Sequence, residues 1–250
     1  MPEELIGLIP AAGKGIRLNL PYPKELYPII RNNRYKPLSQ FVLDSILLAG
    51  VNHVVFVIND TKHLLMGYYG SGQRFNCSIS YVVQEIAENN TASTSPGLAA
   101  ALDSAYHLTS GKTVVFGMPD TIIQPKEVFL TAIQAAQPTD DVVLCLFKTN
   151  HAQKFGMVRL NQQNIATEIV DKPQQTDLEM MWGCIIWRAR FTEFLHEALN
   201  RREIYDFAQI MNEAIQAGMT FRGISFVEDN YFDLGTYEEI MELEKRYHEE

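Results

Sequence analysis

A cluster of small and positively charged residues lies near the amino terminus, in the stretch LIPAAGKGIRLNLPYPKELYPI at positions 8–29. Gly13 and Gly15 let the backbone come close to a ligand and turn its N–H groups toward an anion. Arg17 presents a planar fork that matches phosphate oxygens, and Lys24 presents a compact charge on a segment stiffened by neighbouring prolines. This set suits a triphosphate whose charge shifts during a reaction, although a solvated basic loop has the same composition.

Two other phosphate-binding patterns fit this chain less well. The segment from Gly13 to Leu18 lacks the third glycine of the dinucleotide-binding fingerprint. Neither Gly13-Lys14 nor the sequence SGKT at 110–113 has the upstream glycine that a Walker A loop requires. We therefore expect SGKT to be a turn that leads into a strand.

Short apolar runs alternate with helical patterns through the first 150 residues. Runs rich in Val and Ile are short enough to be strands, at Leu5–Ile9, His53–Ile58, Ile79–Val83, Thr113–Phe116 and Val142–Phe147. Apolar residues at three- and four-residue spacing predict helices at Pro37–Leu48, Thr61–Tyr69, Gly97–Leu108 and Pro125–Ala136. This βαβ alternation predicts a mostly parallel sheet with helices on both faces, which binds ligands at the carboxyl ends of its strands.

The pattern becomes more mixed after residue 150. Strands are predicted at Gly156–Leu160, Ile165–Val170 and Met181–Trp187, and helices at about 190–200, at about 205–217 and at Tyr237–His248. No linker rich in Pro, Gly or Ser interrupts the chain, which favours a single domain over residues 1–250 with halves at about 1–150 and 151–250.

Composition limits the functional classes. The formal net charge of −9 argues against a protein that binds the backbone of nucleic acids. No apolar run is long enough to span a bilayer, and the first residues, MPEEL, carry acid where a secretory signal carries base, so we expect a cytoplasmic protein. Cys77, Cys145 and Cys184 are far apart without metal-ligand spacing and are expected to be buried free thiols.

Six sequence blocks, taken in order, resemble the sugar-phosphate nucleotidylyltransferases, the group that includes glucose-1-phosphate thymidylyltransferase. AAGKGIRL followed by PKELYPI resembles the glycine-rich loop and PK-x-L segment of that family. Similar blocks follow over roughly residues 5–245: YVVQ at 81–84 with GLAAAL at 97–102, FGMPD at 116–120, FGMVRL at 155–160, VDKP at 170–173 and FDLGT at 232–236.

The resemblance implies a three-layer α/β/α Rossmann-like nucleotidyltransferase fold with a mixed, mostly parallel central sheet. It implies transfer of a nucleotidyl group from a nucleoside triphosphate to a sugar-1-phosphate, with Arg17 and Lys24 as catalytic residues. The implied nucleotide-binding residues are Ala11, Ala12, Gly13, Lys14, Gly15, Gln84 and Gly97. The implied sugar-phosphate site, in the half after residue 150, consists of Gly156, Asp171, Lys172, Gly183, Arg201 and Arg202. A homo-oligomer is left open.

Asp120 and Asp233 are the implied ligands of Mg²⁺. Asp120 follows the apolar run Thr113–Phe116 closely, and Asp233 lies between aromatic residues and a Gly-Thr turn, so both could lie at one edge of the sheet. Carboxylate oxygens at that edge suit Mg²⁺ that is shared with phosphates. An aspartate at a strand end is otherwise often a helix cap or a turn residue.

Two departures from the family leave the substrates open. Asp171 stands where glutamate is common, and the loop EIAENNTASTSP at 85–96 is longer and more polar than in the thymidylyltransferases, so the base is undecided. We expect this loop to close over the base. One alternative is a cytidylyltransferase for phosphocholine or another small phosphate ester, in which Trp182 and Trp187 could form a cation-binding wall. Packing of both tryptophans in the strand core is the more ordinary interpretation. A second is a non-catalytic nucleotide-binding regulatory module.

Overall fold

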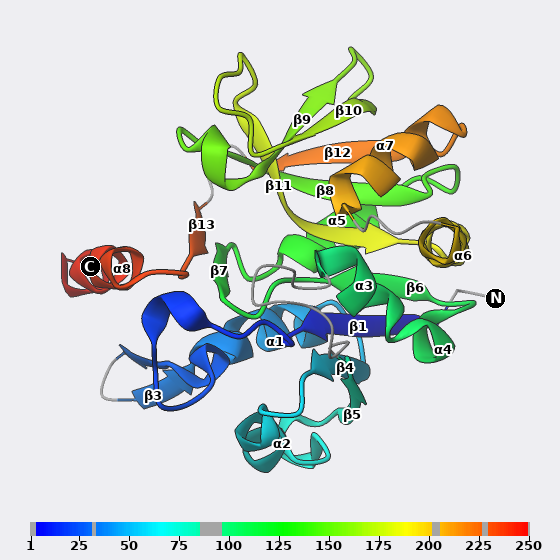
Figure 1. Ribbon diagram of the computed structural model, residues 1–250. Coiled ribbons are helices and arrows are strands. Elements are labelled where there is room, and N and C mark those ends of the chain that lie inside the picture. Colours follow the sequence, from blue (N-terminus) through cyan, green and yellow to red (C-terminus); the bar gives the residue numbers. More distant parts are fainter. Residues whose placement is uncertain (1–3, 32–33, 86–96, 202–205, 227–229, 250) are drawn as a thin grey trace.

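The computed structural model of the protein describes residues 4–31, 34–85, 97–201, 206–226 and 230–249 (Figure 1). Its strands are β1 (Leu5–Pro10), β2 (Pro28–Arg31), β3 (Arg34–Pro37), β4 (His53–Ile58), β5 (Ser78–Val83), β6 (Thr113–Phe116), β7 (Thr121–Gln124), β8 (Val142–Lys148), β9 (Gly156–Leu160), β10 (Ala166–Asp171), β11 (Met180–Trp187), β12 (Phe221–Phe226) and β13 (Asn230–Asp233). Its helices are α1 (Leu38–Leu48), α2 (His63–Tyr69), α3 (Gly97–Asp103), α4 (Tyr106–Thr109), α5 (Val128–Ala135), α6 (Ala189–Asn200), α7 (Phe207–Gln216) and α8 (Tyr237–Glu249).

A nine-stranded mixed sheet runs through the middle of the molecule. Strands β6, β1, β4 and β5 are neighbours and pair in parallel. Strand β11 lies between β6 and β8 and pairs with both in antiparallel fashion, while β8 and β12 are again parallel. The hairpin of β9 and β10 extends from the β11 side of the sheet. The expected mixed, mostly parallel sheet is confirmed.

Helices cover both faces of this sheet because its strands alternate their side chains between two cores. In β1, Ile6 and Leu8 belong to the core under α3, α6 and α7, whereas Ile9 belongs to the core under α1, α2 and α5. Each side chain is at most 1% exposed, as expected for a strand buried on both faces. Figure 1 shows α3 and α7 in front of the sheet. The three-layer α/β/α arrangement is therefore confirmed.

A third, smaller core joins the two ends of the chain. Leu18 and Leu38 from the first 40 residues pack with Ile122, Leu234 and Ile240. Strand β13 pairs with β7 outside the main sheet, and α8 follows it at the side of the molecule (Figure 1). The carboxyl-terminal segment thus lies against the segment that carries the glycine-rich loop.

Several short elements depart from the sequence prediction. The expected helix Gly97–Leu108 is wrong in its extent, since α3 ends at Asp103 and α4 begins at Tyr106. The hairpin of β2 and β3 and the strands β7, β12 and β13 were not predicted, because four of them have only four residues, β12 has six, and none shows a strong apolar alternation. SGKT is confirmed as a turn that leads into β6, with Gly111 at a φ of 74°.

The cysteine prediction holds for two of three residues. Cys145 and Cys184 are buried free thiols and are register partners on β8 and β11. Cys77 is only partly buried, so the expectation of a buried thiol is wrong there. It directly precedes β5, which is at the edge of the sheet and is covered less completely than the central strands.

Within the described part of the chain, we find no helix that is both long and apolar enough to cross a membrane.

Candidate active site

A pocket of about 390 Å³ lies where the loops after β1 and β6 meet the hairpin of β9 and β10. It is lined by Arg17, Leu98, Met118, Asp120, Thr121, Lys154, Phe155, Gly156, Asp171, Lys172, Trp182, Asp206, Phe207, Ala208, Tyr231 and Asp233. Seven of the residues singled out from the sequence are among them, Trp182 included, and they come from segments more than 200 positions apart.

Hydrogen bonds to the end of β4 and the turn after it fix the start of the glycine-rich loop. The N–H of Ala11 donates to the carbonyl of Val57 at 2.6 Å, and the Asn59 amide donates to the carbonyl of Ala12 at 2.7 Å. Gly15 has a φ of 63°, which favours glycine, and a Cβ built there would contact the aliphatic stem of Lys24 at 3.5 Å. The loop therefore turns back beside the lysine, with Gly13 in open space.

Lys24 lies at the start of a 3₁₀ turn, Lys24–Leu26, and its ammonium donates to Oδ2 of Asp120. The two side chains are only 14% and 8% exposed. Burial works against the ammonium, but the charge and hydrogen bond of Asp120, with further negative charge from Glu25 and Asp233, raise the pKa of Lys24 above its usual value. The lysine is therefore held as a cation at the edge of the pocket.

Strand pairing brings Asp233 to Asp120. Strand β13 pairs with β7 so that Asp233 opposes Thr121, and the N–H of Leu234 donates to the carbonyl of Asp120 at 2.9 Å. Burial, followed by the charges of Asp120 and Glu239, raises the pKa of Asp233 to about 6. The pocket thus holds two carboxylates that repel each other.

The position of the Arg17 guanidinium depends on Gly235, the glycine of the FDLGT block. A Cβ on Gly235 would lie 3.0 Å from both terminal nitrogens of the Arg17 guanidinium, tighter than ordinary contact. The absence of a side chain at 235 therefore lets the guanidinium lie flat against the backbone. This contact sets the fork of Arg17 beside Asp233, on the same pocket wall.

Glu239 ties the FDLGT turn to the opposite wall. It forms a capping box at the start of α8, accepting from the N–H groups of Gly235 at 2.9 Å and Thr236 at 2.8 Å. Its other oxygen accepts from the Lys154 ammonium at 2.6 Å. Burial opposes ionisation of this carboxyl, yet the bonds from Lys154 and Thr236 lower its pKa below the usual value. Lys154 was not singled out from the sequence.

The hairpin of β9 and β10 forms the wall opposite Asp120. Asp171 pairs in register with Gly156, and the N–H of Lys172 donates to the carbonyl of Phe155 at 3.0 Å. Lys172 has a φ of 46°, rare for a residue with a side chain, and its ammonium lies 3.6 Å from Asp171. These contacts place the lysine at the mouth of the pocket, 61% exposed and open to a ligand.

Gly156 makes room for an aromatic side chain. A Cβ there would lie only 2.2 Å from Nε1 of Trp182, so any side chain would displace the indole. That Nε1 is buried without a hydrogen-bond partner among the described residues. Trp182 therefore forms a fixed wall of the pocket, whereas Trp187 is 2% exposed and packs in the core.

Other wall residues were missed by sequence reasoning. Tyr231 lies two positions before Asp233, and Asp206 caps α7 through the N–H groups of Ala208 at 2.8 Å and Gln209 at 3.2 Å. Phe207 stands edge-on to Trp182, with ring centroids 6.0 Å apart. A polar cap followed by an aromatic residue was a readable local signal, but nothing in the sequence indicated which helix end faces the pocket.

Several predicted site residues do not line this pocket. Gln84 follows β5 and donates its N–H to Ile58, and Gly97 begins α3 next to the lining residue Leu98. Gly183 is covered by Tyr231 and Phe147. The Arg201 guanidinium pairs with Glu197 on the surface of α6. The roles given to these residues stay predictions; Arg202 and most of the loop at 85–96, from residue 86 on, lie outside the described residues.

The two aspartates fit the donor set of Mg²⁺. Mutual repulsion at Asp120 and Asp233 is the electrostatic strain that a divalent cation relieves, and hard carboxylate oxygens are what it prefers. Lys24 occupies Oδ2 of Asp120, which leaves its second oxygen for a ligand. Among the described residues we find no group of three or more protein side chains able to hold a metal, so a Mg²⁺ ion held by these two aspartates would need further ligands from outside the protein.

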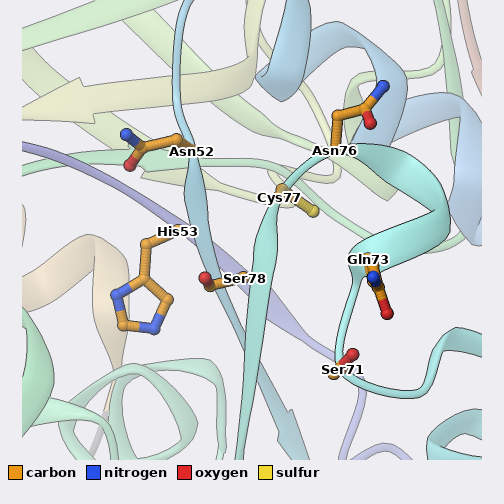
Figure 2. A pocket seen from close by; sticks show the side chains of 7 residues that line it. All are labelled: Asn52, His53, Ser71, Gln73, Asn76, Cys77 and Ser78. Carbon is orange, nitrogen blue, oxygen red and sulfur yellow. The ribbon is translucent and has the colours of Figure 1, made fainter.

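A broader hollow lies elsewhere on the molecule (Figure 2). It is formed by Asn52, His53, Cys77 and Ser78, among others, around the amino ends of β4 and β5. In parallel sheets, ligands bind at the opposite, carboxyl edge. The side chains in Figure 2 are polar, but no ionic cluster is formed among them. We therefore take the smaller pocket as the candidate active site.

Comparisons with known proteins identify the family of this chain. The family described as nucleotidyl transferase matches residues 6–250. The glucose-1-phosphate thymidylyltransferase of Neisseria meningitidis is 26% identical over 248 residues, which cover 94% of this chain and 80% of that protein.

Two solved structures share the fold. A UDP-glucose pyrophosphorylase complexed with UDP-glucose superposes with a TM-score of 0.80 at 21% identity, covering 100% of this chain and 99% of that one. The UTP-bound UGPase from Acinetobacter baumannii has a TM-score of 0.76 at 16% identity, covering 99% and 93%.

Proposed function

Because this chain belongs to the nucleotidyl transferase family, we propose that it transfers a nucleotidyl group from a nucleoside triphosphate to a sugar-1-phosphate and releases pyrophosphate. The convergence of Arg17, Lys24 and Asp120 with the Gly156–Lys172 wall around one pocket carries this proposal. One side presents cations for a polyphosphate, and the other presents a lysine and a shaped wall for an acceptor.

The reaction needs positioning and charge stabilisation rather than a side-chain base. An oxygen of the acceptor phosphate, already ionised near neutral pH, attacks the α-phosphorus in line. The bond from that phosphorus to the bridging oxygen breaks, and pyrophosphate leaves with the electron pair. Lys24 neutralises charge on the α-phosphate, and Arg17 binds the β- and γ-phosphates and stabilises the leaving group.

The acceptor phosphate would bind at Lys172. This ammonium is exposed and its nearest described charge is Asp171 at 3.6 Å, a loose contact that a phosphate could replace. Lys154 is tied to Glu239 and would orient the same wall. Asp120 and Asp233 would hold Mg²⁺, which when bound supplies further charge neutralisation at the phosphates.

A matrix of nucleoside triphosphates and sugar-1-phosphates, with detection of pyrophosphate, tests the proposal. We expect release that requires both substrates. Arg17→Ala should abolish most of it, because the β- and γ-phosphates lose their fork. Lys112→Ala is the matched control, since Lys112 pairs with Glu4 at the amino end of β6, at the opposite edge. Nucleotide binding without pyrophosphate release would support the regulatory module instead.

The base is left to that matrix. The named relatives include a thymidylyltransferase and proteins associated with UTP or UDP-glucose, so thymidine and uridine triphosphates are tested first. The cytoplasm, where nucleoside triphosphates are made, is the compartment that the proposal implies. Oligomerisation and the lack of nucleic-acid binding stay predictions.

Phosphocholine is the second candidate acceptor, because the pocket wall is aromatic and acidic. Trp182, Phe207 and Tyr231 line it together with Asp171 and Asp206, and such a set can hold a quaternary ammonium group. Stimulation of pyrophosphate release by phosphocholine, with loss of that stimulation in Trp182→Leu, would favour this acceptor over a sugar phosphate.

A further inference from the structure

The turn after β4, with the sequence NDTK at 59–62, holds both phosphate-binding segments. Its last residue, Lys62, donates from its ammonium to both carboxylate oxygens of Glu25, at 2.9 and 2.7 Å. Glu25 directly follows Lys24 in the chain. The side chains of Lys62 and Glu25 are 3% and 1% exposed, which makes the pair one of the most deeply buried charged contacts described in the molecule.

The first residue of the same turn reaches the glycine-rich loop. Asn59 is 3% exposed and donates from its amide nitrogen to the carbonyl of Ala12 at 2.7 Å. Its amide oxygen accepts from the N–H and hydroxyl of Thr61, at 2.9 and 2.7 Å, which fixes the orientation of the side chain. One rigid turn thus contacts the glycine-rich loop and the turn of Lys24.

A buried ion pair contributes little net stability, because both charges lose their hydration. Glu25 is also held through its main chain, since the Ser39 hydroxyl donates to its carbonyl at 2.8 Å. The energetic cost of burying two charges here, one residue from Lys24, points to a role beyond folding. Without Lys62, the Glu25 carboxylate would also compete with Asp120 and with phosphate for the Lys24 ammonium.

We propose that Lys62 is a positioning residue that fixes the Lys24 ammonium through its buried ion pair with Glu25. The proposal rests on the proposed role of Lys24 at the α-phosphate. Glu25 points into the core toward Lys62, and Lys24, at the next position of the same 3₁₀ turn, points to Asp120. The pair therefore sets the direction in which Lys24 leaves the backbone.

Lys62→Met keeps most of the side-chain length and removes the charge. We expect kcat to fall at least tenfold, while KM for the acceptor changes less than threefold, because Lys24 acts on the nucleotide. The melting temperature should also fall, since Glu25 is left buried without its partner.

The double variant Glu25→Met with Lys62→Met separates positioning from folding. It removes both buried charges, so the melting temperature should recover toward that of the wild type. We expect kcat to stay at least tenfold low, because the turn of Lys24 has lost its anchor. Recovery of kcat together with the melting temperature would overturn the proposal.

Arg222→Met is the matched control. Arg222 pairs at 2.7 Å with Asp140, whose side chain is 0% exposed, near the amino end of β8 and away from the pocket. This variant should lose thermal stability with an unchanged kcat. If it lowers kcat as much as Lys62→Met does, the effect is one of general stability and the proposal is wrong.

A double-mutant cycle with Lys24→Ala tests the route of the effect. If Lys62 acts through Lys24, Lys62→Met should not lower the residual kcat of Lys24→Ala further, although it still lowers the melting temperature. A full additional tenfold loss would overturn the proposal. The same double-mutant cycle can be measured on the Kd of the triphosphate, determined by calorimetry without an acceptor, and this measurement does not depend on turnover. Failure of the proposed function, seen as no pyrophosphate release by the wild type, is therefore distinguishable from failure of this inference.

Discussion

Lys24→Ala is the most informative single substitution in the active site. The ammonium is 14% exposed and donates to Asp120, whose side chain is 8% exposed, so water cannot easily replace it. The substitution removes a fixed positive charge that is in place before the triphosphate binds. Alanine is tolerated in the 3₁₀ turn, whose backbone bonds from Leu26 to Pro23 and from Tyr27 to Lys24 do not involve the side chain.

The expected loss of kcat follows from the stabilisation that one preorganised charge gives to the transition state. Removal of a single fixed donor at a developing charge costs about 2.7–4 kcal/mol, or roughly a hundredfold to a thousandfold in kcat. Asp120 loses its ion-pair partner at the same time, and it stands beside Asp233, whose pKa its charge already helps to raise. We expect the free energy of unfolding to fall by about 1–3 kcal/mol, the usual range for a buried polar group left without its partner.

Initial rates of pyrophosphate release, measured against each substrate in turn, are the assay. Circular dichroism melts establish that the variant is folded at the assay temperature. Lys112→Ala, at the amino end of β6, removes a lysine that pairs with Glu4 at 2.9 Å and should leave kcat unchanged. A folded Lys24→Ala enzyme with kcat within threefold of the wild type would refute the role given to this lysine.

Three further predictions concern the aspartates and the acceptor wall. Asp120→Asn and Asp233→Asn should each abolish Mg²⁺-dependent pyrophosphate release, with partial rescue by Mn²⁺, and unchanged wild-type activity in EDTA would show that no metal is used. Burial and neighbouring charge raise the pKa of Asp233 to about 6 in the folded protein, against an ordinary value of 3.8. Between these two pH values the folded state binds more protons at Asp233 than the unfolded state does. The free energy of unfolding therefore falls as the pH rises from about 4 to 6. Metal-free Asp233→Asn should therefore melt at a higher temperature than the wild type at pH 7 but not at pH 3.5, and equal melting temperatures at pH 7 would contradict this. Gly156→Ala should raise KM for the acceptor at least fivefold and KM for the triphosphate less than twofold. The reason is that a Cβ at position 156 would lie only 2.2 Å from Nε1 of Trp182 and would displace the indole. Equal rises in both constants would place the defect elsewhere.

The sequence by itself determined the parallel strands β1, β4, β5 and β6 of the main sheet well. Strands His53–Ile58 and Thr113–Phe116 were predicted with the bounds that the structure has, because runs of Val and Ile buried on both faces leave a local signal. The glycine-rich loop and Lys24 were readable for a similar reason: their chemistry is carried by residue types at short spacing. Their proximity is also largely local, since Gly15 and Lys24 are nine positions apart.

Only the tertiary structure decided how the distant segments meet. Asp233 reaches Asp120 through the pairing of two four-residue strands, β7 and β13, which are too short to leave a period in the sequence. Lys154 could not be identified from the sequence, because its place in the site depends on an ion pair with Glu239, 85 positions away. The partner of Glu25 was equally hidden, since an isolated Lys in a sequence normally indicates exposure and Lys62 is buried. Local periodicity records which face a residue buries, whereas these contacts depend on which strands pair and which loops they bring together, and that is settled only when the whole chain packs.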